Sequence, residues 1–174
     1  TWLGERGEDA ARVVRAAVAV SPPQDLHASA AALARGFNRI YTANFLKTLK
    51  RKSLAKLAQY PGLFDRSRML AATSFFEFDD AVTAPLHGFR GCLDYWRRSA
   101  CKPLLAGVRT PLLVINARND PFLPAAHLAR PDQVARDVVL EYPETGGHAG
   151  FLEAGFPGRD WLSGRVLAFL DGHG

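Results

Sequence analysis

The sequence predicts an α/β fold in which parallel strands alternate with helices. Three short apolar segments rich in β-branched residues lie between prolines or turn-forming residues, at 13–21, 112–116 and 138–142. Such segments are typical of buried strands. Helices are predicted over 3–12 and 161–170, and a mixture of loop and helix over 124–136. This alternation indicates a parallel sheet covered by helices.

The middle of the chain, 24–102, lacks strong strand signals and is predicted to form several short helices with irregular connections. Apolar side chains at helical spacing predict one of these helices: Tyr41, Phe45, Leu46, Leu49, Leu54 and Leu57. Pro61-Gly62 predicts a break after them. Asp79-Asp80 follows an aromatic cluster and is predicted as a helix start.

The composition is that of a globular protein of about one domain, with 174 residues, 48% apolar and 22% charged. This excludes a disordered chain, and no apolar run reaches the ~18 residues of a membrane span. Cys92 and Cys101 are too few for a disulfide scaffold and are interpreted as reduced thiols. Residues 1–9 are polar and acidic where a secretory signal is apolar, so a cytoplasmic location is expected. The first residue, Thr1, is not methionine, which is typical of a piece of a longer protein.

Positive charge is concentrated in one part of the chain. The net charge is +5, yet 26–64 contains no acidic residue and seven basic ones: Arg35, Arg39, Lys47, Lys50, Arg51, Lys52 and Lys56. Such a block is either a solvated helix face or a surface that attracts nucleic acid, anionic lipid or an acidic partner. No nucleic-acid motif or stacking platform accompanies it, so the solvated face is preferred and no nucleic acid is expected.

Two titratable residues follow two of the predicted strands. Parallel sheets place their ligands beyond the carboxyl ends of the strands. Asp120 follows the segment 112–116, and His148 follows 138–142 within Gly146-Gly147-His148. Adjacent parallel strands bring such residues within reach of each other. Histidine can act as a general base near neutral pH, and a carboxylate behind it fixes its tautomer.

The same two residues also have simpler interpretations, since Asp after a strand often caps a helix and a loop His is often only polar. No functional role is predicted for the other four histidines, His27, His87, His127 and His173. No spacing of His, Cys, Asp or Glu indicates a metal site, and no cofactor is expected.

Seven segments together carry a family resemblance: AVSPPQDL at 19–26, GFNRIY at 36–41, EFDDAVTAP at 77–85, HGF at 87–89, LDYW at 93–96, NDPF at 119–122 and GGHAGF at 146–151. In order and spacing the chain resembles the C-terminal half of an α/β-hydrolase fold esterase of the YheT-type branch. The resemblance implies that 1–23 is the end of a helix plus a core strand, 24–102 a helical lid, and 103–174 the C-terminal core.

The resemblance implies a Ser-Asp-His triad in which Asp120 is the acid and His148 the base. Asn119 stands where relatives often carry a second aspartate. No G-x-S-x-G elbow surrounds any serine: Ser21, Ser29, Ser53, Ser67, Ser74, Ser99 and Ser163. Cys92 and Cys101 lack this context as well. The nucleophile and the oxyanion hole are therefore expected upstream of Thr1.

The expected activity is hydrolysis of a carboxylic ester by a longer protein, of which this chain alone is inactive. Aromatic side chains in 24–102 suggest an apolar acyl or alcohol group, although each could equally belong to a core: Phe37, Tyr41, Phe45, Phe75 and Phe76. The apolar strand at 13–20 is expected to leave an exposed edge, which would make the chain marginally soluble. Alternatives are acyl transfer to another alcohol, chemistry with an aspartate nucleophile, a non-catalytic relative, or a binding module that uses 35–56.

Overall fold

The computed structural model describes residues 1–151 and 160–173. The chain divides into two compact units. The sheet unit contains Thr1–Asp25 and Ala100–Gly174, and the helical unit contains Leu26–Ser99. The helical unit is therefore an insertion in the sheet unit. At the two ends of the insertion, the Cys101 N–H donates a hydrogen bond of 3.0 Å to the Pro23 carbonyl.

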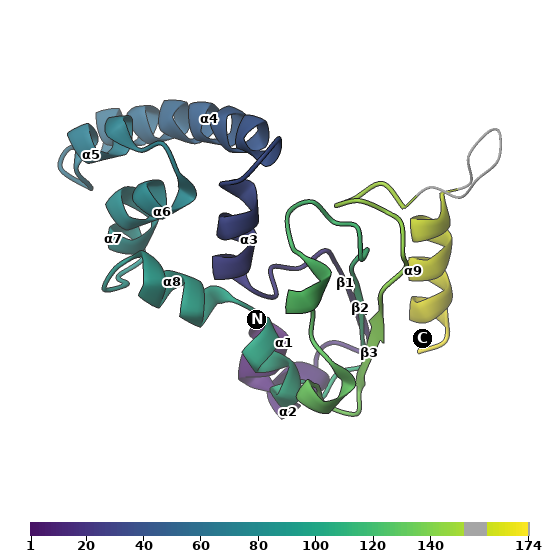
Figure 1. Ribbon diagram of the computed structural model, residues 1–174. Helices are drawn as coiled ribbons and strands as arrows, with labels where there is room; N and C mark the ends of the chain where they lie inside the picture. The colour runs from purple at the N-terminus through teal and green to yellow at the C-terminus, as the bar shows by residue number, and fades with distance from the viewer. Residues whose placement is uncertain (152–159, 174) are drawn as a thin grey trace. The chain divides into compact units, whose positions relative to one another are not determined.

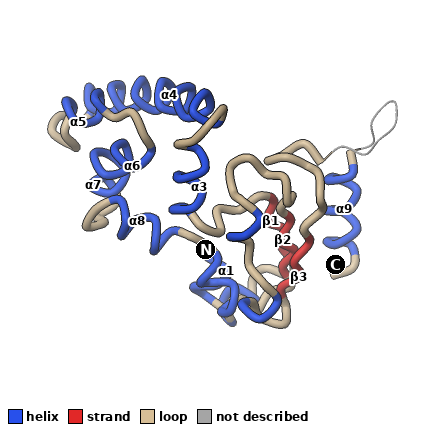
Figure 2. The backbone as a smooth tube through the Cα atoms, in the orientation of Figure 1, coloured by secondary structure: helices blue, strands red, loops and turns tan. Residues whose placement is uncertain are grey.

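Three parallel strands form the sheet, in the order β1-β2-β3 (Figures 1 and 2). They are β1 (Ala17–Val20), β2 (Leu112–Ile115) and β3 (Val138–Glu141). Ala17 is paired with Leu112, which is paired with Val138. The predicted parallel α/β sheet is confirmed. The first strand is shorter than predicted because the Val14 N–H bonds to the carbonyl of Ala10, which keeps this segment in a helix-like turn.

The two faces of β2 are both covered, which explains why all four of its residues are buried. On one face Leu112 and Val114 pack with Leu105 and Val108, and Leu3 of α1 (Trp2–Arg6) packs partly against this cluster. On the other face Leu113 and Ile115 pack with Phe169 of α9 (Trp161–Asp171), the helix predicted over 161–170 (Figure 1). A strand that is buried on both faces needs apolar residues at every position, which explains the continuous apolar sequence of β2.

The remaining helical elements of the sheet unit are short. The predicted helix at 3–12 is two helices, α1 and α2 (Glu8–Ala11), interrupted at Gly7, where φ is +46°. Glycine adopts this left-handed conformation without the penalty of a Cβ atom. The segment predicted as mixed contains 3₁₀ turns at Ala125–His127 and Pro131–Gln133. Another 3₁₀ turn, Lys102–Gly107, precedes β2.

The helical unit contains helices and loops and no strand (Figure 2). Its elements are α3 (Leu26–Leu33), α4 (Asn38–Gln59), α5 (Arg66–Ala71), α6 (Phe75–Phe78), α7 (Ala84–Leu86) and α8 (Cys92–Ser99), with a π-helical turn at Asp79–Thr83. The expectation of short helices was wrong for α4, which has 22 residues. No glycine or proline interrupts that segment, and α4 ends two residues before Pro61-Gly62.

One side of α4 packs into the core of the helical unit. Leu46 is buried with Met69, Phe78 and Val82, and Leu49 and Leu57 pack against the same cluster. Tyr41, Phe45 and Leu54 of the predicted stripe are instead partly exposed, by 36–47%. The apolar periodicity predicted the helix correctly. The side of the helix that is buried, however, carries the leucines that pack near α5 and α6 and not the aromatic residues.

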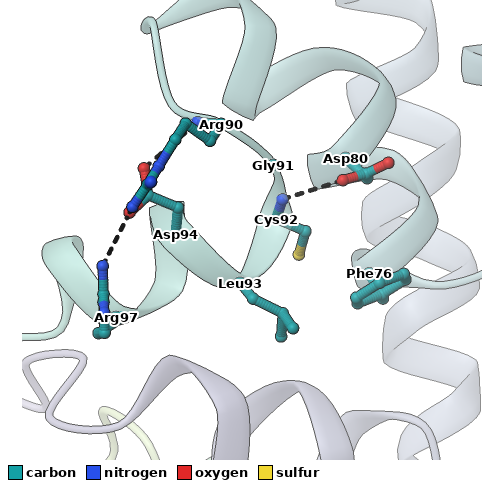
Figure 3. A pocket seen from close by; sticks show the side chains of 8 residues that line it. All are labelled: Phe76, Asp80, Arg90, Gly91, Cys92, Leu93, Asp94 and Arg97. Carbon is teal, nitrogen blue, oxygen red and sulfur yellow. Dashed lines mark hydrogen bonds and ion pairs between the residues drawn. The ribbon is translucent and has the colours of Figure 1, made fainter.

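Asp79 and Asp80 connect helices instead of starting one, so that prediction was wrong. Their helix begins at Phe75, where the Ser74 hydroxyl accepts a hydrogen bond from the Glu77 N–H. Asp79 accepts hydrogen bonds from Trp96 Nε1 at 2.8 Å and from the Thr83 hydroxyl at 2.6 Å. Asp80 accepts one from the Cys92 N–H at the start of α8 (Figure 3). It also pairs with Arg68 at 2.8 Å.

These adjacent carboxyl groups have opposite pKa shifts. Burial raises the pKa of Asp79, whereas the Cys92 N–H and Arg68 lower the pKa of Asp80. Asp80 therefore stabilises the fold above about pH 4, and this contribution is lost as pH falls through its lowered pKa. The contribution of Asp79 is fully present at low pH and is lost as pH rises through its raised pKa.

We expect Asp79→Asn and Asp80→Asn to change the melting temperature with opposite pH dependence. The deficit of Asp80→Asn relative to wild type should be largest near neutral pH and shrink in acid. The melting temperature of Asp79→Asn relative to wild type should increase as pH rises. Circular dichroism melts from roughly pH 3 to pH 7 measure both. Parallel profiles for the two variants would contradict the assignment.

Both cysteines are free and buried, as the sequence predicted for reduced thiols. Burial raises the pKa of Cys92 to about 12, with the charges of Asp79 and Asp80 adding to the effect. A thiol of this pKa stays protonated and unreactive near neutral pH. In the part of the chain that the structure describes, no helix is long and apolar enough to cross a membrane.

Candidate active site

Asp120 and His148 lie together beyond the carboxyl ends of β2 and β3. His148 Nδ1 is 2.9 Å from Asp120 Oδ2. The Asp120 side chain is 1% exposed, and that of His148 is 46% exposed. The structure thus joins a buried carboxylate to an imidazole that solvent can reach. The sheet geometry used in the sequence analysis explains this, because β2 and β3 are adjacent and parallel.

The carboxylate of Asp120 is held through both of its oxygens. Oδ1 accepts a hydrogen bond of 2.8 Å from the Phe122 N–H, while Oδ2 faces His148. The Asp120 N–H in turn donates to the Ala117 carbonyl. Asp side chains favour this kind of local turn, in which the carboxylate accepts from the backbone two residues on. The second oxygen is left in a fixed position for the imidazole.

The loop that carries His148 is shaped by its two glycines. At Gly146 a Cβ atom would lie 2.6 Å from the Phe151 ring, so any side chain would displace that buried residue. Gly147 has φ +59°, a conformation that favours glycine. The N–H groups of Gly150 and Phe151 both donate to the Gly146 carbonyl. These contacts close a tight turn around His148.

Two polar side chains that spacing could not identify hold this loop from neighbouring strand ends. Asn119 Oδ1 accepts a hydrogen bond of 2.9 Å from the Gly147 N–H. The Ser21 hydroxyl donates to the backbone carbonyl of His148. Ser21 follows β1 and has φ +45°, which is uncommon for a residue with a side chain. In the sequence, the only sign of this role was that Ser21 and Asn119 follow β1 and β2 and so lie at the same edge of the sheet.

A buried amide network lies among the loops at this edge. Gln24 is buried, and its Nε2 donates to Asn116 Oδ1 at 2.6 Å. Its Oε1 accepts from the Ala129 N–H at 2.7 Å, and the Tyr142 hydroxyl lies 3.4 Å from Nε2. Burial raises the pKa of Tyr142. Gln24 therefore joins the segments that follow β1, β2 and β3, and the sequence analysis did not identify it.

A second histidine–carboxylate pair is present in the sheet unit. His127 Nδ1 is 3.1 Å from Asp25 Oδ2. The exposed fraction of the histidine side chain is 47%, close to that of His148, but the Asp25 side chain is 33% exposed. Water competes more strongly for an exposed carboxylate. Burial of the carboxylate therefore distinguishes the Asp120–His148 pair.

Among the described residues, no serine hydroxyl donates to an imidazole nitrogen of His148. The seven serines named above all lie in the described ranges, and the hydrogen bond from Ser21 goes to the backbone of His148. No group of three or more His, Cys, Asp or Glu side chains in those ranges could hold a metal ion. The described residues provide an acid–base pair.

The helical unit has an open hollow of about 550 Å³ between α6 and α8 (Figure 3). Its lining includes Cys92 and Asp94. Cys92 is too strongly protonated to act as a nucleophile. The Asp94 carboxylate is surrounded by three arginines, Arg90, Arg97 and Arg98. The Asp94 carboxylate is occupied by these ion pairs, and the residues that line the hollow show no nucleophile–base pair.

Comparisons with known proteins identify relatives of this chain, although no family model matches it. "Putative esterase YheT" of Escherichia coli (strain K12) is 34% identical over 171 residues, which are 97% of this chain and 50% of that protein. An "Abhydrolase domain-containing protein" of Dictyostelium discoideum is 28% identical over 87% of this chain and 38% of its own length. Human "Monoacylglycerol lipase ABHD2" is 33% identical over 51% of this chain and 22% of its own length.

Among solved structures, the esterase PF2001 of Pyrococcus furiosus aligns with 97% of this chain and 49% of its own, at a TM-score of 0.45 and 19% identity. The chain spans about half the length of YheT. The identity with YheT extends over nearly the whole chain, including the three strands of the parallel sheet. This chain is therefore similar over nearly its whole length to about half of an esterase-type protein, and its other relatives include an abhydrolase domain-containing protein.

Proposed function

We propose that this chain supplies the acid and the base of a serine hydrolase that cleaves carboxylic esters. The observation that carries the proposal is the 2.9 Å contact between His148 Nδ1 and the buried carboxylate of Asp120. The names of two relatives, an esterase and a monoacylglycerol lipase, support an ester as the substrate class. No cofactor is required for this chemistry.

In the proposed mechanism, a serine outside this chain attacks the ester carbonyl. His148 Nε2 accepts the serine proton and then donates it to the leaving alcohol, and the same steps with water release the acid. Asp120 holds the proton on Nδ1 and stabilises the imidazolium. Backbone N–H groups outside this chain bind the oxyanion.

The helical unit is proposed as the lid of the complete enzyme, and its aromatic residues suggest an ester with an apolar group. The buried free thiols fit a reducing compartment such as the cytoplasm. The proposed lid concerns the helical unit, whereas Asp120 and His148 belong to the sheet unit. Evidence against one of these two assignments would therefore not contradict the other.

A serine-directed fluorophosphonate probe tests the proposed function. The longer natural protein should be labelled rapidly, and its His148→Ala variant should be labelled much more slowly. The isolated 174-residue chain should show neither labelling nor ester turnover. Turnover by the isolated chain that survives His148→Ala and requires one of its own serines would contradict the proposal.

Asn119→Ala should lower kcat of the longer protein by roughly tenfold, because a loosened His148 loop samples fewer productive geometries. Asn44→Ala, an exposed change on α4, is the matched amide control and should leave kcat unchanged. Esterase assays together with melting curves separate a positioning effect from unfolding. An unchanged kcat for Asn119→Ala would contradict the positioning role.

A further inference from the structure

The start of α4 presents two large apolar side chains to solvent, one at the residue before the helix and one in its first turn. Phe37 is 89% exposed and Ile40 is 61% exposed. Gly36 turns the chain with φ +52°. The Thr42 hydroxyl donates to the Leu33 carbonyl at 2.7 Å, which links α4 to the end of α3. This hydrogen bond holds the start of α4 against the end of α3, so the backbone that carries the two apolar side chains is held in place.

Among the described residues, the basic residues of 26–64 are not paired with carboxylates. The helical unit has 12 lysines and arginines against 5 aspartates and glutamates, a net charge of +7. All five carboxylates accept hydrogen bonds within 65–98, at the start of α5, around α6 or on α8: Asp65, Glu77, Asp79, Asp80 and Asp94. In the described ranges no basic residue of 26–64 forms an ion pair.

Apolar and basic residues share one face of α4. Phe37, Ile40, Lys47 and Arg51 follow one another at intervals of 3, 7 and 4 residues, which places them along one side of a helix. This side, here called the outer face, lies opposite the side that buries Leu46 and Ser53. Its first turn is apolar, and its middle is positively charged.

We propose that the outer face binds the surface of a membrane that contains anionic lipid. Phe37 and Ile40 would enter the boundary between headgroups and acyl chains, while Lys47 and Arg51 contact lipid phosphates. A second copy of this face is a poor partner, because the same uncompensated cations would meet. Nucleic acid would engage the cations but leave Ile40 without a favourable environment.

Vesicle flotation of the longer natural protein tests the proposal. This protein should float with vesicles of phosphatidylcholine and phosphatidylglycerol in a roughly 3:1 ratio and bind phosphatidylcholine alone far more weakly. Binding should fall steeply at roughly 0.5 M salt, where screening is strong. Phe37→Ser should weaken binding by about tenfold, and Lys47→Gln or Arg51→Gln by roughly fivefold each.

Two controls in the same unit keep the test specific. Leu93→Ser removes an apolar side chain of nearly the same exposure as Ile40, at 58%, and Arg66→Gln removes an exposed cation at the start of α5, which is not part of the outer face. Neither should change vesicle binding, and circular dichroism should show that every variant is folded. Any one of three results would overturn the proposal. These are no flotation at low salt, an equal loss of vesicle binding in the control variants, or RNA binding that needs the cations but not Phe37.

Discussion

His148→Ala in the longer protein should lower kcat for ester hydrolysis by about 10,000-fold, with KM little changed. The imidazole carries the proton in both half-reactions, and loss of such a group leaves only oxyanion stabilisation and binding. Asp120→Asn should cost a similar factor, because an amide cannot hold the correct tautomer. Steady-state assays with a soluble p-nitrophenyl ester measure these effects.

The matched control for His148 is His127→Ala. His127 has nearly the same exposure and also contacts a carboxylate. If burial of the carboxylate identifies the functional pair, His127→Ala should change kcat less than about twofold. A large loss in His127→Ala together with full activity in His148→Ala would assign catalysis to the other pair.

Ile115→Ala should destabilise the sheet unit by about 2–5 kcal/mol, the range for truncation of a large buried side chain. Ile115 is fully buried on the central strand and packs in the cluster that includes Phe169 of α9. The cavity it leaves lies where both neighbouring strands restrict relaxation. Urea unfolding of the 174-residue chain, followed by tryptophan fluorescence, gives the change in the free energy of unfolding.

Val139→Ala on β3 is the control for this truncation. Val139 is also a strand residue in the sheet but is exposed, so its change should cost no more than about 0.5 kcal/mol. Similar losses for the two variants would show that the packing around β2 does not carry the stability of the sheet unit.

The parallel sheet and the meeting of Asp120 with His148 could be predicted because both follow from local signals and one general rule. Runs of β-branched residues mark strands, and parallel strands deliver the residues after them to one edge. The start of β1 could not be predicted in this way. Val13 and Val14 have strong strand propensity, but a hydrogen bond to Ala10 places Val14 in a turn.

Contacts between distant segments could not be predicted from spacing. Gln24 meets Asn116 across 92 residues of sequence, and Ser21 meets the carbonyl of His148 across 127. A short polar side chain after a strand is common, and nothing in its neighbours says which loop it will hold. The same limit explains Asp80, whose partner Cys92 lies on another helix.

The hydrogen bond between Cys101 and Pro23 has a consequence for how the chain folds. It joins the two points between which the helical unit is inserted, so the pairing of Ala17 with Leu112 does not depend on how long the insertion is. Closing a chain loop costs entropy that grows only slowly with loop length. A helical unit that forms early from local contacts would leave few flexible residues to close. Variation in the length of 26–99 should therefore change the stability of the sheet only slightly.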